Sequence, residues 1–274
     1  MKGRRFGGEW FGRFEHTKII PDIDVCFLIR FHFCFLRLIT GIFRGAPLHD
    51  AIHNGGAMTF GNDGKLYFTT GDGGTPENAQ DRKNNLGNLI RLNDDGSIPD
   101  DNPFTTANGY ESYQCRKTKG KVPDDAGDDA ICSEIFAFGL RNPFRLSMDP
   151  NEKEKTRLAI SDVGGKVWEE INYAGTDYVG VNYGHKEYEG PCFRHSDQEC
   201  PVPREFEEPF YWYHHREKKD GCVAGSAFVP EGLWPEEYKF LFIDVSSIFF
   251  NLIYMMCVAT WFCGFVSLLA WEYN

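Results

Sequence analysis

The sequence lacks any stretch of about ten residues with the spacing of an amphipathic helix. This absence argues against a helical bundle, and the 29 glycines and 14 prolines favour a turn-rich all-β fold. The sequence also lacks an excess of basic residues, since 40 acidic side chains outnumber 29 lysines and arginines and leave a net charge of -11. A chain this acidic is not expected to bind nucleic acid or to adhere to anionic lipid, because both need a basic face.

No pair of cysteines has the Cys-x-x-Cys spacing of a zinc site, so we expect no zinc. Nine cysteines are nevertheless many for a cytosolic domain of this length. Cys115 and Cys132 bracket an acidic loop, Cys192 and Cys200 bracket a short polar loop, and Cys222 stands apart. The two bracketing pairs are interpreted as disulfides and therefore indicate an oxidising compartment. Buried free thiols are the alternative.

The two ends differ from the middle of the chain. Residues 248–271 carry no charged side chain and are long enough to cross about 30 Å of hydrocarbon as a transmembrane helix. Residues 25–43 are also apolar, but Arg30, His32 and Arg37 make a spanning helix costly there, and no signal-peptide pattern follows them. Both ends begin abruptly, so foreign sequence joined by a faulty gene model is a second explanation. A segment that covers a sheet edge is the third.

Three segments share one pattern, in which an alternating strand and a turn are followed by an apolar strand that ends in aspartate. The segments are Ala57–Asp72, Arg145–Asp162 and Ser226–Asp244. Their spacing of roughly 80 to 90 residues indicates a repeated sheet unit with long loops. Asn62-Asp63-Gly64 predicts a tight hairpin in the first segment, because Asp and Gly tolerate positive φ. The acidic stretch 102–129 predicts a long loop between strands.

Five short motifs follow one another through the middle of the chain. They are His53–Gly56, Gly71–Gly74, Leu140–Pro143, Asp162–Gly165 with Glu169–Asn172, and Val181–Gly184. Their order and spacing resemble the glucose/sorbosone dehydrogenase family, soluble six-bladed β-propellers that hold pyrroloquinoline quinone (PQQ) and calcium. The resemblance runs from about Gly45 to about Asp244. It implies an all-β chain that covers about three to four blades of such a propeller, and therefore a fragment.

The resemblance also implies a division of the chain into three parts. Residues 1–44 form an atypical N-terminal segment, residues 45–245 form the partial propeller, and residues 246–274 form a hydrophobic C-terminal segment.

Oxidation of an aldose at its anomeric carbon removes a hydroxyl proton while a hydride leaves the same carbon. A base that titrates near neutrality is therefore needed beside an electron acceptor. The resemblance implies that His53 is this base and that Asp72 orients its ring. Without the family, a histidine followed by two glycines would be interpreted as a turn residue.

The remaining site residues also come from the resemblance. Arg141 is expected to meet the charge that develops on the quinone oxygen, and Asn142 to hydrogen-bond the cofactor. By itself the Arg141 motif would be a turn with a surface ion pair. Gly164 and Gly165 align with carbonyls that bind calcium. A second, structural calcium is implied at Glu170 and Tyr183.

Some positions depart from the family pattern. Ala57 stands where an arginine is common, and Glu231 aligns with a lysine that contacts the quinone in active members. The arginines that clamp the quinone carboxylates would follow Asp244. Because the cofactor is acidic, Glu231 is expected to repel it, and the loss of cations is expected to weaken its binding.

Two functions of different classes therefore remain open. The first is PQQ-dependent oxidation of a glucose-type aldose. The second is a non-catalytic propeller that binds a protein or glycan ligand, as implied by the Hedgehog-interacting-protein-like branch, which 208–216 and 231–238 resemble. Both imply an extracellular, secreted protein, with a membrane anchor only if 248–271 is genuine.

Overall fold

The computed structural model describes residues 52–215, 221–235, 238–246 and 267–272. These residues belong to the second of two compact units, Gly41–Asn274. Strands dominate them, and the predicted all-β class is confirmed. The short 3₁₀ helices are η1 (Pro76–Ala79), η2 (Thr106–Asn108) and η3 (Cys115–Lys117). The predicted N-terminal segment, residues 1–44, lies outside the described residues.

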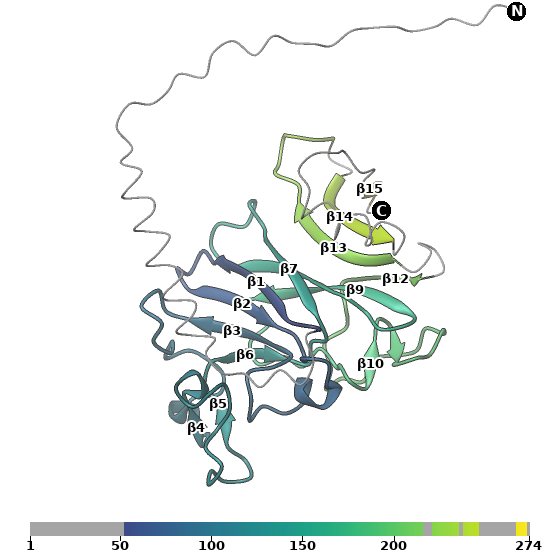
Figure 1. Ribbon diagram of the computed structural model, residues 1–274. Coiled ribbons are helices and arrows are strands. Elements are labelled where there is room, and N and C mark those ends of the chain that lie inside the picture. Colours follow the sequence, from purple (N-terminus) through teal and green to yellow (C-terminus); the bar gives the residue numbers. More distant parts are fainter. Residues whose placement is uncertain (1–51, 216–220, 236–237, 247–266, 273–274) are drawn as a thin grey trace, which may run out of the picture. The chain divides into compact units, whose positions relative to one another are not determined.

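Two four-stranded antiparallel sheets form the centre of this unit (Figure 1). The first consists of β1 (Gly55–Phe60), β2 (Leu66–Thr70), β3 (Asn88–Leu92) and β6 (Ile135–Phe138). The second consists of β7 (Pro143–Met148), β8 (Arg157–Asp162), β9 (Trp168–Gly175) and β12 (Tyr211–His214). A third sheet pairs β13 (Gly221–Phe228), β14 (Tyr238–Ser246) and β15 (Ser267–Glu272).

Alternate residues of the inner strands enter two different cores, because successive side chains of a strand point to opposite faces. Tyr67 and Leu89 pack with Leu158 and Ile160 of the second sheet. Their sequence neighbours pack on the other face, in a cluster that includes Phe68, Ile90 and Leu92 and the segment around Cys115. Every residue of β2 and β3 is therefore buried, including the polar Thr69, Thr70, Asn88 and Arg91.

The first strands of the three sheets lie side by side, with β1 next to β7 and β7 next to β13 (Figure 1). Each sheet begins with a hairpin, and the three hairpins are the three segments that the sequence pattern predicts. Asp72 follows β2, Asp162 ends β8, and Asp244 lies in β14. The repeated unit is confirmed, whereas closure into a six-bladed ring and the number of blades stay predictions.

The turn at Asn62–Gly64 joins β1 to β2 as predicted. The Gly61 amide donates to the Lys65 carbonyl over 2.9 Å, and Gly64 has a φ of 71°, which suits glycine. The strands therefore meet in register, with Phe60 opposite Leu66.

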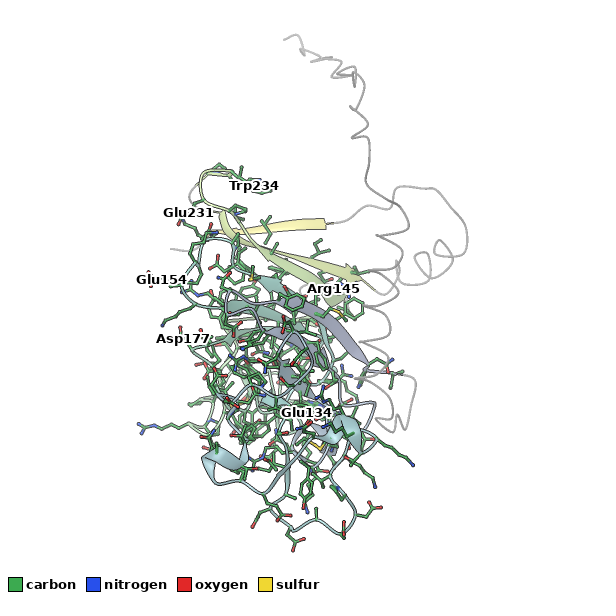
Figure 2. The ribbon with its side chains drawn as sticks, turned by 90° about the vertical axis from the view of Figure 1, so that its left-hand side faces the viewer. Glu134, Arg145, Glu154, Asp177, Glu231 and Trp234 are labelled. Carbon is green, nitrogen blue, oxygen red and sulfur yellow. A yellow bond between two sulfur atoms is a disulfide. The ribbon has the colours of Figure 1, made fainter. Side chains whose placement is uncertain are left out.

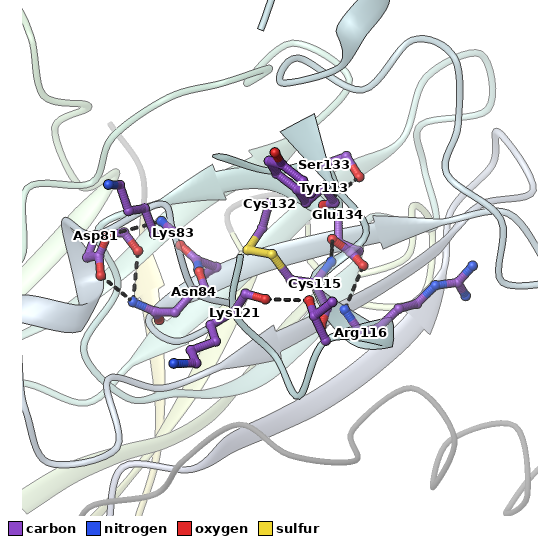
Figure 3. The surroundings of a disulfide bond; sticks show 12 residues. Asp81, Lys83, Asn84, Tyr113, Cys115, Arg116, Lys121, Cys132, Ser133 and Glu134 are labelled. Atoms are coloured by element: carbon purple, nitrogen blue, oxygen red, sulfur yellow. Dashed lines mark hydrogen bonds between the residues drawn. A yellow bond between two sulfur atoms is a disulfide. The ribbon is translucent and has the colours of Figure 1, made fainter. Parts of the chain in front are cut away.

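The predicted long loop joins β3 to β6, and a disulfide braces it (Figure 3). It contains β4 (Ser112–Tyr113) and β5 (Ile131–Cys132). Cys115 and Cys132 are bonded, as predicted. The buried Glu134 carboxylate accepts hydrogen bonds from the Cys115 and Arg116 amides at 3.1 and 3.0 Å.

The second predicted disulfide joins Cys192 to Cys200, close to the short pair β10 (Tyr188–Glu189) and β11 (Cys192–Phe193). Cys222 forms no disulfide with another described cysteine. These pairs exclude the alternative of free thiols at the four bonded positions.

Within the described ranges, no helix is both long and apolar enough for a bilayer. Residues 248–266 of the predicted transmembrane segment, 248–271, lie outside these ranges. The prediction of a helix is wrong for the last part of this segment, because Ser267–Glu272 forms strand β15. There Leu268 pairs with Ile243 of β14, so the backbone hydrogen bonds of this part go to a neighbouring strand.

Candidate functional site

His53 lies two residues before the start of β1, and its ring contacts the aspartate that follows β2. The His53 Nδ1 atom lies 2.7 Å from Asp72 Oδ1. The His53 side chain is 19% exposed, whereas Asp72 is fully buried, so the far edge of the imidazole can meet a ligand. His53 has a φ of 53°, a conformation that few non-glycine residues adopt. Gly55 is required next to it, because a Cβ there would lie 2.8 Å from the Gly71 nitrogen.

Asp72 is held from both sides. Its Oδ2 atom lies 3.0 Å from His185 Nε2, and its Oδ1 also accepts the Gly74 amide at 2.8 Å. Burial by itself would raise the pKa of Asp72, but the hydrogen bonds from His185, His53 and Gly74 outweigh it and hold this pKa far below its usual range. Asp72 is therefore ionised and acts only as an acceptor, so His53 donates from Nδ1 and keeps Nε2 as its basic atom.

Arg141 lies before β7, the position that His53 has before β1. Its backbone joins the two sheets, because the Arg141 carbonyl accepts the Asp72 amide at 2.8 Å while the Arg141 amide donates to Asp162 Oδ2 at 2.9 Å. A Cβ at Gly71 would lie 2.0 Å from the His53 oxygen and 3.0 Å from the Arg141 oxygen. The backbones of the predicted base and the predicted cation thus converge on Gly71–Asp72.

The Arg141 side chain turns toward the loop after β8. Its Nη1 atom donates to the Val163 carbonyl at 2.8 Å and to the Gly164 carbonyl at 2.6 Å. Neighbouring Asn142 accepts the Gly55 amide at 3.3 Å through Oδ1. Arg141 and Asn142 are both half-buried, so each has surface left for a ligand.

A small cavity of ≈ 10 Å³ adjoins Arg141, room for about one water molecule or ion. Its walls come from the segment before β7, from β8 and the loop after it, from β9 and from the region around β10: Arg141, Asp162, Val163, Gly164, Glu170, His185, Tyr188 and Glu189. Burial raises the pKa of Asp162 and of Glu170, and the negative charge of Asp162 raises that of Glu170 further.

Glu189 is the third carboxylate of this cavity. Its Oε1 atom accepts three backbone amides, from Lys166, Val167 and Trp168, at 3.0 to 3.1 Å. Burial would raise the pKa of Glu189, but these hydrogen bonds outweigh it and lower that pKa. Its buried Oε2 atom has no hydrogen-bond partner among the described residues and faces the Cβ position of Gly165, 2.8 Å away.

Comparison with known proteins identifies the family. Residues 34–236 match the family model for glucose/sorbosone dehydrogenase. The chain belongs to the glucose/sorbosone dehydrogenase family. It is 30% identical over 206 residues to the aldose sugar dehydrogenase YliI of Escherichia coli, a match that covers 74% of this chain and 47% of the relative.

Two further relatives and a solved structure agree with this family. The HIPL1 protein of Arabidopsis thaliana is 36% identical over 44% of this chain and 17% of the relative. Quinoprotein glucose dehydrogenase B of Acinetobacter calcoaceticus is 32% identical over 44% and 23%. The apo crystal structure of the soluble aldose sugar dehydrogenase from Escherichia coli gives a TM-score of 0.54 at 28% identity, over 74% of this chain and 51% of that one. The chain spans about half the length of the aldose sugar dehydrogenase YliI.

Of the residues expected to bind calcium in this family, the structure brings Gly164, Gly165 and Glu170 to the same cavity edge. Tyr183 is not among the cavity residues, and its buried hydroxyl donates to the Tyr173 carbonyl at 2.7 Å. The donor set of carbonyls and carboxylates suits a hard cation, and the unpartnered Glu189 oxygen supplies a ligand atom. Sequence reasoning missed Glu189, although an acidic residue before Gly190 was a weak signal.

Glu231 corrects a sequence prediction. It lies in the exposed turn between β13 and β14, where its amide donates to Asn151 Oδ1 at 2.9 Å. Asn151 follows the end of β7, whereas Arg141 precedes the start of the same strand. Figure 2 shows Glu231 on the same side as Glu154, which lies in the β7–β8 turn. Glu231 and Arg141 therefore lie at opposite ends of the strands. This separation is too large for Glu231 to repel a cofactor that is bound next to Arg141.

A second cavity, of ≈ 350 Å³, is lined by residues of the η1 region and of the disulfide-braced loop. Its lysines already have acidic neighbours. Lys121 Nζ lies 2.5 Å from Asp124, and Lys83 Nζ lies 3.8 Å from Asp128. The cavity therefore offers little uncompensated charge to a ligand.

Proposed function

We propose that this protein oxidises a glucose-type aldose at its anomeric carbon, with PQQ as the electron acceptor. The observation that carries the proposal is the contact of the partly exposed His53 with the buried Asp72, next to the half-buried Arg141, at the start of neighbouring sheets. Membership of the family and the similarity to a quinoprotein glucose dehydrogenase support the cofactor.

His53 carries the proton step of this proposal. Its Nε2 atom takes the proton of the anomeric hydroxyl while the hydride leaves C1, so the aldose loses two electrons and becomes a lactone. Bound PQQ supplies the two-electron acceptor for that hydride. Asp72 keeps Nδ1 protonated and stabilises the imidazolium, because it stays ionised beside the ring.

Arg141 and Asn142 are proposed to bind the quinone. The guanidinium is fixed by the Val163 and Gly164 carbonyls, so it does not have to reorganise when negative charge develops next to it. Asn142 is fixed by the Gly55 amide through its oxygen and keeps its NH₂ group for an acceptor.

Calcium is proposed at the acidic cavity, with ligands from Glu170, Glu189 and the carbonyls of Gly164 and Gly165. The Gly164 carbonyl already accepts from Arg141, but a carbonyl oxygen has a second lone pair. Three clustered carboxylates offset the repulsion between the cation and the guanidinium. Tyr183 stays a prediction as a ligand of a second calcium.

The disulfides also support a proposed location. Two bonded cysteine pairs need an oxidising compartment, and we place the protein outside the cytosol, in the extracellular space.

A non-catalytic propeller that binds a protein or glycan is the second candidate. It is favoured by the match to HIPL1, whose 36% identity exceeds that to YliI, although over a shorter segment.

One experiment separates the two functions. The purified full chain is mixed with PQQ and Ca²⁺, PQQ binding is measured by calorimetry, and glucose-dependent reduction of an artificial dye is followed. We expect dye reduction that falls by about 10²- to 10⁴-fold in His53→Ala. His195→Ala, at an exposed histidine, is the matched control and should be unchanged. Absence of PQQ binding would favour the binding propeller.

A further inference from the structure

A second histidine contacts Asp72, and no motif of the sequence points to it. His185 follows the Val181–Gly184 motif and is 4% exposed. Its Nε2 atom lies 3.0 Å from Asp72 Oδ2, while His53 Nδ1 lies 2.7 Å from Oδ1. The two oxygens of one carboxylate thus each bind a different imidazole.

His185 is held in place by a small polar network. Gln80 Nε2 donates to the His185 carbonyl at 2.5 Å and to Asn182 Oδ1 at 2.9 Å. Asn182 Nδ2 donates back to Gln80 Oε1 at 2.8 Å, and the His185 amide donates to the Gly139 carbonyl at 3.0 Å. The imidazole therefore has little freedom to leave Asp72. The conformational entropy of this side chain is already lost when the protein folds.

The charged groups around this pair are few. Asp72 contacts both rings, and Arg141 and Arg194 act on His185 through their positive charges. Asp162 interacts electrostatically with Asp72 from the neighbouring sheet. Because Asp72 is ionised, His185 donates its Nε2 proton to it.

We propose that His185 is a positioning residue that acts on the base His53 through Asp72. A carboxylate bonded at one oxygen can rotate about its χ2 bond, whereas a donor on each oxygen fixes its plane. The hydrogen bond to Oδ2 also withdraws negative charge from Oδ1, and this weakens the attraction between Asp72 and an imidazolium at position 53. This inference rests on the proposed function only in that it takes His53 as the catalytic base.

The test compares His185→Phe with His185→Gln, which keeps an N–H donor for Asp72. In the full chain with labelled histidine, the His53 signal is assigned by its loss in His53→Ala and titrated by NMR. We expect the His53 pKa to rise by about 0.5 to 1 unit in His185→Phe. We also expect the acid limb of the pH profile of kcat to move up equally, kcat at neutral pH to fall about tenfold, and the sugar KM to stay unchanged.

His215 provides the matched control. It is also a buried histidine bonded to a buried carboxylate, with Nε2 2.7 Å from Glu169 Oε1, in the second sheet. His215→Phe should leave the His53 titration unchanged, and His185→Gln should restore the wild-type value. An unchanged His53 titration in a folded His185→Phe or an unrestored one in His185→Gln would overturn the inference. If the His53 pKa shifts but the wild type oxidises no sugar, the positioning stands and the proposed function fails.

Discussion

Asp72 and Asp162 occupy similar places in two successive sheets, because Asp72 lies shortly after the second strand of its hairpin and Asp162 is the last residue of the corresponding strand. Their partners differ. Asp72 binds two imidazoles and the Gly74 amide, and these hold its pKa low. Among the residues that the structure describes, the Asp162 side chain accepts only the backbone amides of Arg141 and Asn142, and burial next to the Glu170 carboxylate raises its pKa. The comparison shows that the repeat places an aspartate at a similar point of each sheet. The side chains that contact this aspartate determine whether it is charged and what role it can have.

The largest expected effect comes from replacing Asp72, the aspartate that contacts the proposed base. Asp72→Asn should reduce kcat for sugar oxidation by about 10³- to 10⁴-fold, because an amide cannot stabilise the His53 imidazolium or keep its tautomer. Asp162→Asn should reduce kcat far less and should lower stability by about 1–3 kcal/mol, because an NH₂ group would face backbone donors. Dye-coupled kinetics and denaturant unfolding check both variants. Equal losses of kcat would contradict the assignment.

The two disulfides allow the stability of the sheets to be compared. Replacing both Cys115 and Cys132 by serine should lower the free energy of unfolding by about 3 kcal/mol, because the bond closes a long loop. The shorter loop closed by Cys192 and Cys200 should cost about 0.5 kcal/mol less. Denaturation midpoints of the two double variants measure the difference. A larger loss at the Cys192–Cys200 bond would contradict this order.

Glycine substitutions compare the loop that follows Asp162 with the start of β1, next to His53. A Cβ at Gly164 would lie 1.5 Å from the Trp168 carbonyl, so Gly164→Ala should cost about 2–3 kcal/mol of stability and displace the Arg141 partner carbonyl. At Gly56 a Cβ would meet no atom within 4 Å, and only its positive φ of 104° opposes a side chain. Gly56→Ala should therefore cost about 1 kcal/mol. Thermal unfolding distinguishes the two values.

A last expected effect concerns the pH dependence of stability and its removal by calcium. Asp72 has a lowered pKa, so its contribution to stability is present above its ordinary pKa of 3.8 and is lost as the pH falls into the acid range. Asp162 has a folded pKa raised from 3.8 to about 7, so its contribution is present at low pH and is lost as the pH rises toward 7.

Without calcium, we therefore expect stability to decline by about 1–2 kcal/mol between pH 5 and pH 8. Saturating Ca²⁺ should remove this decline, because the cation favours ionised Asp162 and Glu170. Urea unfolding in the presence of a chelator or of Ca²⁺ measures this change in the free energy of unfolding, with Mg²⁺ as the control ion. A decline that Ca²⁺ leaves unchanged would contradict calcium at the cavity.

Much of the fold could be predicted, because its signals are local. Alternating apolar residues predict the hairpin strands, Asn62–Gly64 predicts their turn, and the loop-bracketing cysteines predict the bonded pairs. The contact between His53 and Asp72 was also expected from the family motifs, and the structure places the two side chains 2.7 Å apart. Its role in catalysis stays a prediction.

Other parts of the site could not be predicted, because they depend on where loops of different sheets meet. Glu231 has the sequence position expected of a cofactor contact, yet the direction of β13 carries it to the opposite end of the sheet. Glu189 becomes a candidate ligand only because β10 brings it beside Gly165.

The sequence by itself determined the strand hairpins, the disulfide pairs and the type of residue at positions 53, 72 and 141, since periodicity, turn chemistry and motif spacing act over short distances. Only the tertiary structure decided that His185, 113 residues beyond Asp72, binds its second oxygen, and that three carboxylates share one small cavity. Such contacts depend on the packing of two sheets, and burial then sets the charge of each group.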